Sequence, residues 1–165
     1  MLDRDAERLM AEARTFEKNL LNFFWRQGVS YDEGEDLVQE TYLRLWNYRD
    51  QYEPTAKLST FLFLMARQVR LDALRRQTRR ERREESWGQE QPTTADPSTS
   101  CAREDVRWAV ARLSEPLRDV VELGVFQDLP YAEVAAILGI PVGTVKSRMS
   151  NALKKLKEIF DERGS

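Results

Sequence analysis

The chain has 165 residues and a mass of 19.3 kDa, which allows one domain or two small ones and is too short for a barrel enzyme. Hydrophobic residues make up 41% of the sequence and charged residues 33%, a composition typical of a soluble helical protein. The sequence has no histidine, which excludes Ser-His-Asp catalysis, Cys-His catalysis and zinc sites built on histidine. Its single cysteine, Cys101, excludes an internal disulfide and a cysteine-based zinc site, and it fits a reducing compartment.

The N-terminal residues alternate in charge and no apolar core follows them, so no signal peptide is expected. No stretch approaches the roughly 18 apolar residues of a membrane span. We therefore expect a cytoplasmic protein without membrane insertion.

Basic residues are concentrated in two places although the net charge is only -2. Such segregation predicts two anion-facing surfaces, whereas a single run would equally suit a solvated helix face. The first run holds Arg67, Arg70, Arg75, Arg76, Arg79, Arg80, Arg82 and Arg83 against Asp72 and Glu81, and the second holds Lys146, Arg148, Lys154, Lys155 and Lys157 with no acid.

The N-terminal part of the chain is predicted to be helical, because its apolar residues recur at helical spacing and no alternating Val/Ile segment demands a sheet. Ser59 and Thr60 are candidate caps for its last helix. The expected elements are a helix over 4–25, a break at 28–30, a helix over 32–48, a loop holding Pro54, and a long helix from residue 59 into the arginine run.

Residues 84–100 are rich in Glu, Ser, Gln, Thr and Pro, which predicts a flexible linker. Beyond it, four helices are expected over about 104–113, 116–126, 131–138 and 141–160, with Gly139 ending the third. The predicted fold class is all-α, with two small helical domains joined by that linker.

The last two of these helices have the layout of a helix-turn-helix, in which the second helix enters the major groove of DNA. A projection at 3.6 residues per turn places Val145, Met149, Ala152, Leu153 and Leu156 on an inner face. Ser147, Ser150, Asn151 and Lys154 fall opposite, where they could reach base edges, and Lys146, Arg148 and Lys155 flank them at positions suited to phosphates. An ordinary amphipathic hairpin is the alternative.

A second motif lies on the helix expected over 32–48. Its projection buries Leu37, Thr41 and Leu45, and leaves Asp36, Gln39, Glu40 and Leu43 together on the outside. A leucine among acids and amides on an outward face indicates a protein docking site. The alternative reading, a divalent metal held by Asp32, Glu33, Glu35, Asp36 and Glu40, is disfavoured because no second carboxylate helix faces them.

The third motif spans 61–76 and follows a loop with aromatic residues. Arginines beside aromatic rings suit single-stranded nucleic acid, since arginines contact the backbone and rings stack on bases. Trp46 and Phe61 are expected to belong to the core, and Tyr52, among polar neighbours, is the better candidate for stacking.

The segment Asp36–Trp46 resembles region 2.2 of bacterial sigma-70-family factors, and residues 60–76 resemble their regions 2.3 and 2.4. Residues 113–121, 129–135 and 141–148 are similar to region 4. With only these two regions and a short linker, the chain resembles an extracytoplasmic-function (group IV) sigma factor. Gln68 stands where the family usually has asparagine and Phe61 where it usually has tryptophan, so the family's base preference is not carried over.

The resemblance implies a non-enzymatic transcription initiation factor with no catalytic residue, metal or cofactor. It implies three partners: core RNA polymerase through the clamp helices of its largest subunit, promoter DNA, and an anti-sigma factor. The implied division is region 2 over 1–83, the linker over 84–103 and region 4 over 104–165. The implied sites are Asp36, Gln39, Glu40 and Leu43 for polymerase; Tyr52, Arg67, Gln68, Arg70, Arg75 and Arg76 for the -10 element; and Thr144, Lys146, Ser147, Arg148, Ser150, Asn151, Lys154 and Lys155 for the -35 element.

Two other functions fit parts of the pattern. A stand-alone helix-turn-helix repressor or activator would bind duplex DNA unaided, usually as a dimer. A carboxylate-metal nuclease would be sensitive to chelation.

Overall fold

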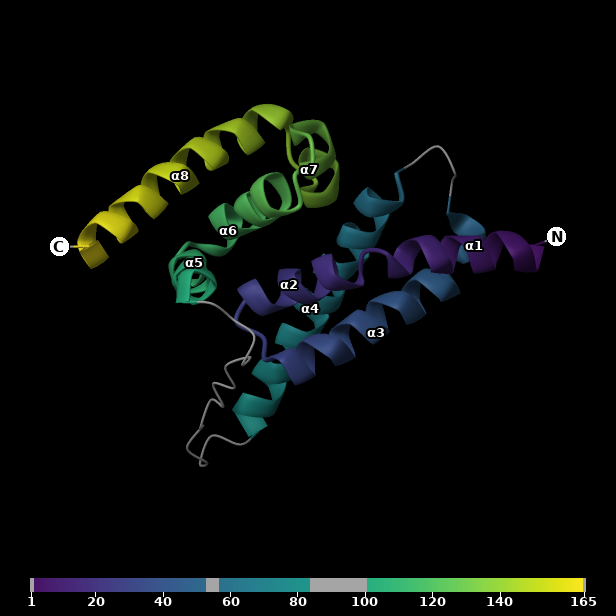
Figure 1. Ribbon diagram of the computed structural model, residues 1–165. Coiled ribbons are helices and arrows are strands. Elements are labelled where there is room, and N and C mark those ends of the chain that lie inside the picture. The colour runs from purple at the N-terminus through teal and green to yellow at the C-terminus, as the bar shows by residue number, and fades with distance from the viewer. Residues whose placement is uncertain (1, 53–56, 84–100, 165) are drawn as a thin grey trace. The chain divides into compact units, whose positions relative to one another are not determined.

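The computed structural model describes residues 2–52, 57–83 and 101–164, and within these ranges the chain forms helices and no strand (Figure 1). The expected all-α class is confirmed. The chain divides into two compact units, Met1–Phe24 with Val29–Asp96, and Trp25–Gly28 with Pro97–Ser165. The expected linker falls mostly on residues 84–100, which lie outside the described part of the chain.

The first unit contains four α-helices and a short 3-10 helix. The α3 helix packs against both α1 and α4, and α1 also contacts α4. Figure 1 shows this arrangement, with α3 running beside α1 and crossing α4. The elements are α1 (Leu2–Arg14), α2 (Glu17–Arg26), α3 (Tyr31–Asn47), η1 (Arg49–Gln51) and α4 (Leu58–Arg83).

The single helix expected over 4–25 is wrong, because the chain breaks between α1 and α2. The Thr15 hydroxyl donates to the carbonyl of Glu12 at 2.6 Å, and the N–H groups of Thr15 and Phe16 donate three residues back, at 3.1 and 3.0 Å. These short-range bonds tighten and end the first helix. The bend lets Ala13 and Leu20, on either side of it, both be fully buried.

The break expected at 28–30 is confirmed. Gly28 adopts a φ of 89°, a left-handed conformation that glycine takes without steric cost. Ser30 then caps α3, since its side chain accepts a hydrogen bond from the N–H of Glu33 at 3.3 Å. The sequence signals for the start of α3 were therefore local ones.

The α4 helix begins at Leu58, so the prediction that Ser59 and Thr60 cap it is wrong. Leu58 is buried, and the N–H of Phe61 donates to the carbonyl of Lys57, which places Ser59 and Thr60 inside the first turn. The core of the unit joins α2 and α4 through edge-to-face rings, with Phe23 5.3 Å from Phe24 and 5.7 Å from Phe63. The expected loop at Pro54 lies outside the described residues.

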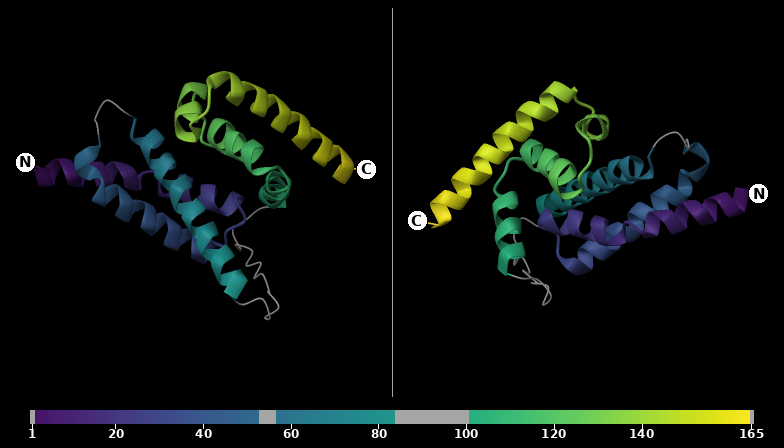
Figure 2. Two further views of the ribbon diagram at one scale, coloured as in Figure 1. Left: turned by 180° about the vertical axis from the view of Figure 1, so that it is seen from behind. Right: turned by 45° about the horizontal axis from the view of Figure 1, so that its top comes forward.

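The second unit contains α5, α6, α7 and α8, with a π-helical turn, η2, continuing α6. The α8 helix packs against α5, α6 and α7 (Figure 2). The bounds are α5 (Cys101–Ala111), α6 (Glu115–Val121), η2 (Glu122–Phe126), α7 (Tyr131–Leu138) and α8 (Val142–Gly164), so α5 starts earlier and α8 ends later than the sequence predicts.

Glu122 is a fully buried acid in η2 that the sequence reading did not single out. Its carboxylate accepts two hydrogen bonds at 2.7 Å from the guanidinium of Arg26 and one at 3.2 Å from the side chain of Gln127. Arg26 is the last residue of α2, and the segment Trp25–Gly28 belongs to the second unit although the rest of α2 belongs to the first. Burial raises the pKa of Glu122, and the hydrogen bonds from Arg26 act against that rise.

The C-terminal end of α8 contacts α5 through Arg163. Arg163 forms an ion pair with Asp105 at 2.8 Å, and its guanidinium lies 4.6 Å from the ring centre of Trp108. Arg112 lies 3.9 Å from the centre of the same ring. Together with the apolar contacts to α6 and α7, these contacts fix the direction of α8 within its unit. In the described part of the chain, no helix is both long and apolar enough to cross a membrane.

Candidate nucleic-acid interface

The turn between α7 and α8 has the geometry expected of a helix-turn-helix. Gly139 ends α7 with a φ of 67°, and the N–H of Ile140 closes the turn by donating to the carbonyl of Ala135 at 3.1 Å. Val134 and Ile137 are buried and hold α7 in its unit. The sequence predicted both the end of α7 at Leu138 and the role of Gly139, and both are confirmed.

The inner face of α8 follows the sequence projection with one exception. Val145, Met149 and Ala152 are buried as expected and Leu156 is half-buried, but Leu153 is 50% exposed. At 3.6 residues per turn, Leu153 lies about 80° around the helix from Val145, at the edge of the stripe that packs. The placement of Leu153 on the inner face was therefore wrong, and Ile159 continues the stripe instead.

The outer face of α8 carries the short polar side chains that the sequence predicted there. Ser147, Ser150, Asn151 and Lys154 are exposed, as are Lys146 and Lys155, whereas Thr144 and Arg148 are half-buried. The Ser147 hydroxyl donates to the carbonyl of Thr144 at 3.1 Å, and Lys155 lies 3.8 Å from Glu158. Both contacts are on the surface and could be exchanged for a ligand.

On α3, the buried and exposed faces agree with the projection except at Glu40, which is half-buried. Leu37, Thr41 and Leu45 are buried, and the Thr41 hydroxyl is satisfied by donating to the carbonyl of Leu37 at 2.8 Å. Asp36 and Gln39 are exposed, and Leu43 is 63% exposed. An apolar side chain this exposed on a helix that packs on two sides is available to a partner.

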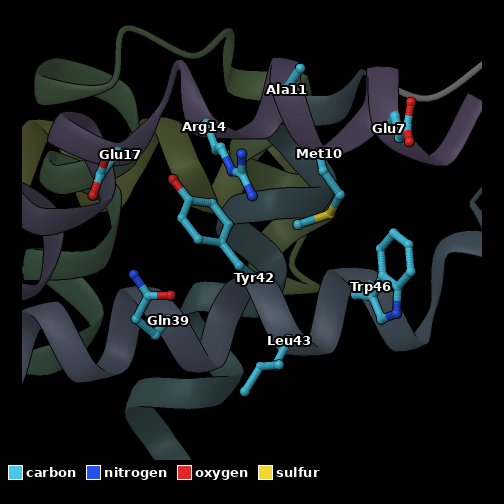
Figure 3. A pocket seen from close by; sticks show the side chains of 9 residues that line it. All are labelled: Glu7, Met10, Ala11, Arg14, Glu17, Gln39, Tyr42, Leu43 and Trp46. Atoms are coloured by element: carbon cyan, nitrogen blue, oxygen red, sulfur yellow. The ribbon is translucent and has the colours of Figure 1, made fainter. Parts of the chain in front are cut away.

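Beside Leu43, a groove of about 650 Å³ runs between α1 and α3 (Figure 3). Figure 3 shows the side chains of Met10 and Arg14 on α1 facing those of Tyr42 and Trp46 on α3. The Tyr42 hydroxyl donates to the carbonyl of Ala13 at 3.4 Å, which links the two helices at the groove. Burial raises the pKa of Tyr42 to about 12, and the negative charge of Glu17 adds to that rise.

Trp46 is 40% exposed, so the expectation that it belongs to the core is wrong. Arg49 holds the ring from outside: its guanidinium lies 4.1 Å from the ring centre and donates to the carbonyl of Trp46 at 2.7 Å. The sequence analysis did not predict that Trp46 lies on the surface. The available signal was its position three residues after Leu43, which places both on one side of α3.

Glu40 differs from Asp36, Gln39 and Leu43, the other three residues of the predicted docking site on α3, because it is half-buried and paired. It accepts from Arg44 on its own helix at 2.9 Å and from Arg76 on α4 at 3.3 Å. Arg44 also reaches Asp72 on α4 at 2.9 Å. Burial alone would lower the pKa of Arg44, but its hydrogen bonds to Asp72 and Glu40 raise it. This ion-pair network joins α3 to α4.

The residues predicted for the -10 element, Tyr52 and five residues of α4, differ in how exposed their side chains are. The ring of Tyr52 packs against that of Phe61 at 5.5 Å, so Phe61 is half-buried beside Tyr52. Burial raises the pKa of Tyr52, with a further contribution from Glu12. Gln68, Arg75 and Arg76 are exposed, and Arg67 and Arg70 are half-buried.

Within the described ranges, no three Asp, Glu or Cys side chains gather closely enough to hold a metal ion.

Comparison with known protein families assigns both units. The family model described as "Sigma-70 region 2" matches residues 13–80, and the one described as "Sigma-70, region 4" matches residues 103–156. The sigma factor RpoE of Cereibacter sphaeroides is 32% identical over 147 residues, which cover 87% of this chain and 81% of that protein. The chain belongs to the sigma-70 family. Like this relative, it is an extracytoplasmic-function sigma factor.

Other relatives agree with this assignment. The extracytoplasmic-function sigma factor SigL of Mycobacterium tuberculosis is 32% identical over 136 residues, covering 80% of this chain and 77% of that protein. The solved structure of the sigma factor RpoE from Bartonella quintana in complex with the anti-sigma factor NepR matches with a TM-score of 0.73 at 26% identity, covering 96% of both chains. CnrH in complex with the cytosolic domain of CnrY shares the fold, with a TM-score of 0.70 at 22% identity, over 96% of this chain and 99% of that one.

The family assignment defines the function. The chain is a sigma factor that directs promoter-specific initiation of transcription by RNA polymerase, and the core polymerase and promoter DNA are its partners. Sigma factors are non-enzymatic initiation factors.

Proposed function

We propose that the sigma factor uses three surfaces, one on α8 for the -35 element, one on α3 for core polymerase, and one on Tyr52 and α4 for the -10 element. We also propose that the chain has no enzymatic activity of its own. Residues 1–83 serve as region 2, 84–103 as the linker and 104–165 as region 4. The observation that carries the proposal is the arrangement of α8, whose buried stripe leaves Ser147, Asn151 and Lys154 facing outward behind the Gly139 turn.

The -35 element is read by α8. Ser147, Ser150 and Asn151 offer short hydrogen-bonding groups to base edges, and Lys154 lies with them on the exposed face. Lys146, Arg148 and Lys155 lie at the flanks, where their ammonium and guanidinium groups meet phosphates, and Thr144 contributes its hydroxyl at the start of the helix.

The core polymerase docks on the outward face of α3. Asp36, Gln39 and Leu43 make the direct contact, with the exposed leucine entering the partner and the polar residues around it. Glu40 contributes at the edge of this face, where Arg44 and Arg76 hold its carboxylate. The partner surface is the pair of clamp helices of the largest polymerase subunit.

The -10 element is opened and held by Tyr52 and α4. Tyr52 stacks on a base, Gln68 contacts a base edge, and Arg67, Arg70, Arg75 and Arg76 contact the strand backbone. The polymerase supplies much of the affinity, which agrees with the net charge of only -2. The factor acts in the cytoplasm, and an anti-sigma protein restrains it, in keeping with its likeness to a sigma factor solved with an anti-sigma factor.

The deciding experiment combines the purified chain with core RNA polymerase and measures specific initiation on genomic promoter fragments. Initiation at defined start sites is expected, and Ser147→Ala with Asn151→Ala should abolish it while leaving core binding intact. A chain that binds duplex DNA as a dimer and never stimulates core polymerase would instead be a stand-alone repressor or activator. If the chain does not support initiation but cleaves nucleic acid, and a metal chelator abolishes that cleavage, the chain would instead be the nuclease.

A further inference from the structure

The ion-pair network between α3 and α4 is a chain of five charged side chains. At its centre, Nη2 of Arg44 lies 2.9 Å from Oε1 of Glu40 and 2.9 Å from Oδ2 of Asp72. The second oxygen of Glu40 lies 3.3 Å from Nη2 of Arg76. The second oxygen of Asp72 lies 3.4 Å from Nη1 of Arg75. Arg44 is therefore the central cation, and Arg75 and Arg76 are the outer cations, of one continuous network.

The central contacts of this network are stronger than the outer ones. The side chain of Arg44 is 25% exposed and both of its contacts are short. The side chains of Arg75 and Arg76 are 70% and 58% exposed, and their contacts with the acids are longer. Water screens an exposed ion pair, so such a pair is easily exchanged. The outer arginines can therefore leave their carboxylates for another anion, while Arg44 stays between the two acids.

The two acids depend on Arg44 for compensation of their charge. Their inner oxygens both lie 2.9 Å from one nitrogen atom, so at most twice that distance separates them. Two negative charges this close repel each other unless a cation lies between them. Without Arg44, Glu40 and Asp72 would hold the outer arginines more firmly, because these would then have to supply the missing positive charge.

The pairing of the outer arginines agrees with a directing role for Arg44. Asp72 and Arg76 are four residues apart on α4, a spacing that favours an ion pair on one helix. Arg76 instead contacts Glu40 on the other helix, while Asp72 contacts Arg44 and Arg75. The position of Arg44 between the helices therefore determines which acid each outer arginine meets.

The acids of the network compete with DNA for the outer arginines. Arg75 and Arg76 are two of the four arginines proposed to contact the backbone of the -10 strand. A guanidinium group can form paired hydrogen bonds with a phosphate, which are stronger than a single long contact with a carboxylate. To form them, however, each outer arginine must leave its acid. The positive charge available to the strand therefore depends on how firmly Glu40 and Asp72 hold these two side chains.

We propose that Arg44 and Asp72 are positioning residues for the -10 contacts and that they act in opposite directions. Arg44 neutralises part of the charge on the two acids, which leaves the outer arginines available to phosphates. Asp72 competes with phosphates for Arg75 and so limits the affinity for the strand. Neither residue contacts DNA, and both act through the outer arginines. This inference rests on the proposed assignment of Arg75 and Arg76 to the -10 strand.

The test measures the affinity of holoenzyme for a promoter fragment on which the chain supports initiation, with core polymerase saturated by each variant. Arg44→Gln should lower this affinity about two- to fivefold and Asp72→Asn should raise it by a similar factor, the range that partly exposed ion pairs produce. The double variant should bind nearly as the wild type does. Arg44→Lys keeps the central charge and should retain most of the affinity. High salt should reduce both effects, because it screens the charges.

Two controls separate this role from loss of stability and from a general change of charge. Both substitutions break the same ion pair, so a purely structural role would lower promoter affinity in both. Arg8→Gln on α1 and Glu81→Gln on α4 make the same changes of charge outside the network and should have smaller effects. In an Arg75→Gln background, Asp72→Asn should no longer raise the affinity, because the arginine through which it acts is gone.

Three results would each overturn the proposal: a fall in affinity with both substitutions, equal effects of the control variants, or a gain from Asp72→Asn that persists in the Arg75→Gln background. Combined Arg75→Gln and Arg76→Gln tests the underlying assignment. If this pair has no effect on promoter binding, the -10 assignment of the outer arginines fails, and this inference fails with it. If the pair lowers the affinity but Arg44→Gln and Asp72→Asn do not act in opposite directions, only the positioning role fails.

Discussion

The side chains of Glu40 and Arg76 meet across α3 and α4, with Nη2 of Arg76 3.3 Å from Oε2 of Glu40. The sequence predicts that Glu40 takes part in polymerase docking and that Arg76 contacts the -10 element. Their contact means that the two proposed surfaces share a charge network, since Arg44 joins Glu40 to Asp72 as well. A change at one surface therefore alters the charges available at the other.

The network should stabilise the α3–α4 contact modestly. Glu40→Gln combined with Arg76→Gln in a double-mutant cycle should give a coupling free energy of about 0.5 kcal/mol, because both side chains are partly exposed and water screens the pair. Arg44→Gln with Asp72→Asn should give a somewhat larger value, since the distance is shorter and Arg44 is 25% exposed. Chemical denaturation at low and high salt measures both cycles. Coupling that does not fall with salt would argue against an electrostatic link.

Leu43→Asp should weaken core polymerase binding at least tenfold, because a charge would replace an apolar side chain that the proposed partner buries. The substitution should leave the helical circular dichroism and the thermal midpoint unchanged, since Leu43 is 63% exposed. Leu153→Asp, at a leucine 50% exposed on α8, is the control and should retain core affinity. If the Leu43→Asp and Leu153→Asp variants bind core polymerase with equal affinity, the exposed face of α3 is not the docking site.

Tyr52→Ala should reduce open complexes more than polymerase recruitment, because a stacked base contributes about 1 to 3 kcal/mol. Tyr52→Phe keeps the ring, including its contact with Phe61, and should open promoters normally. Permanganate reactivity of the melted strand measures opening. If the alanine variant is equally impaired on premelted and duplex templates, Tyr52 has no part in the opening step.

Substitutions of base-contacting and phosphate-contacting residues on α8 should have different effects on promoter binding. Asn151→Ala should shift preference at one or two -35 positions, with a cost of about 1 to 3 kcal/mol on the preferred sequence, whereas Lys155→Ala should weaken all sequences alike and lower the salt slope by about one. Competition binding of holoenzyme to a library of -35 variants at several salt concentrations compares them. A reordered ranking from Lys155→Ala with none from Asn151→Ala would mean that α8 sits in the groove at a different rotation.

Tyr42 should make stability fall at alkaline pH. Its folded pKa of about 12 exceeds the ordinary value of 10, so the folded state holds the proton more tightly than the unfolded chain. This contribution is fully present below pH 10 and is lost as the pH rises from 10 through about 12. Tyr42→Phe should flatten that part of the stability curve, and the absorbance titration should lose a tyrosinate step near pH 12. An unchanged titration would show that Tyr42 is accessible to water in the groove.

Local chemistry in the sequence by itself determined much of this protein. The glycines at 28 and 139 and the cap at Ser30 set helix ends through backbone geometry, and the 3.6-residue period correctly identified Thr41, Val145 and Met149 as buried. The same period placed Asp36, Gln39 and Asn151 outside. These features depend on neighbours within one or two turns, which a sequence displays directly.

Only the tertiary structure decided the remainder. Trp46 is exposed because α1 leaves a groove beside α3 instead of covering it, and Leu153 is exposed because the packing of the second unit covers a stripe of α8 that ends short of its side of the helix. Glu40 and Arg76 are thirty-six residues apart, and nothing local couples them. Whether an apolar side chain is covered, and which charge meets which, depends on how whole helices pack, so residues with the same local pattern can have different surroundings.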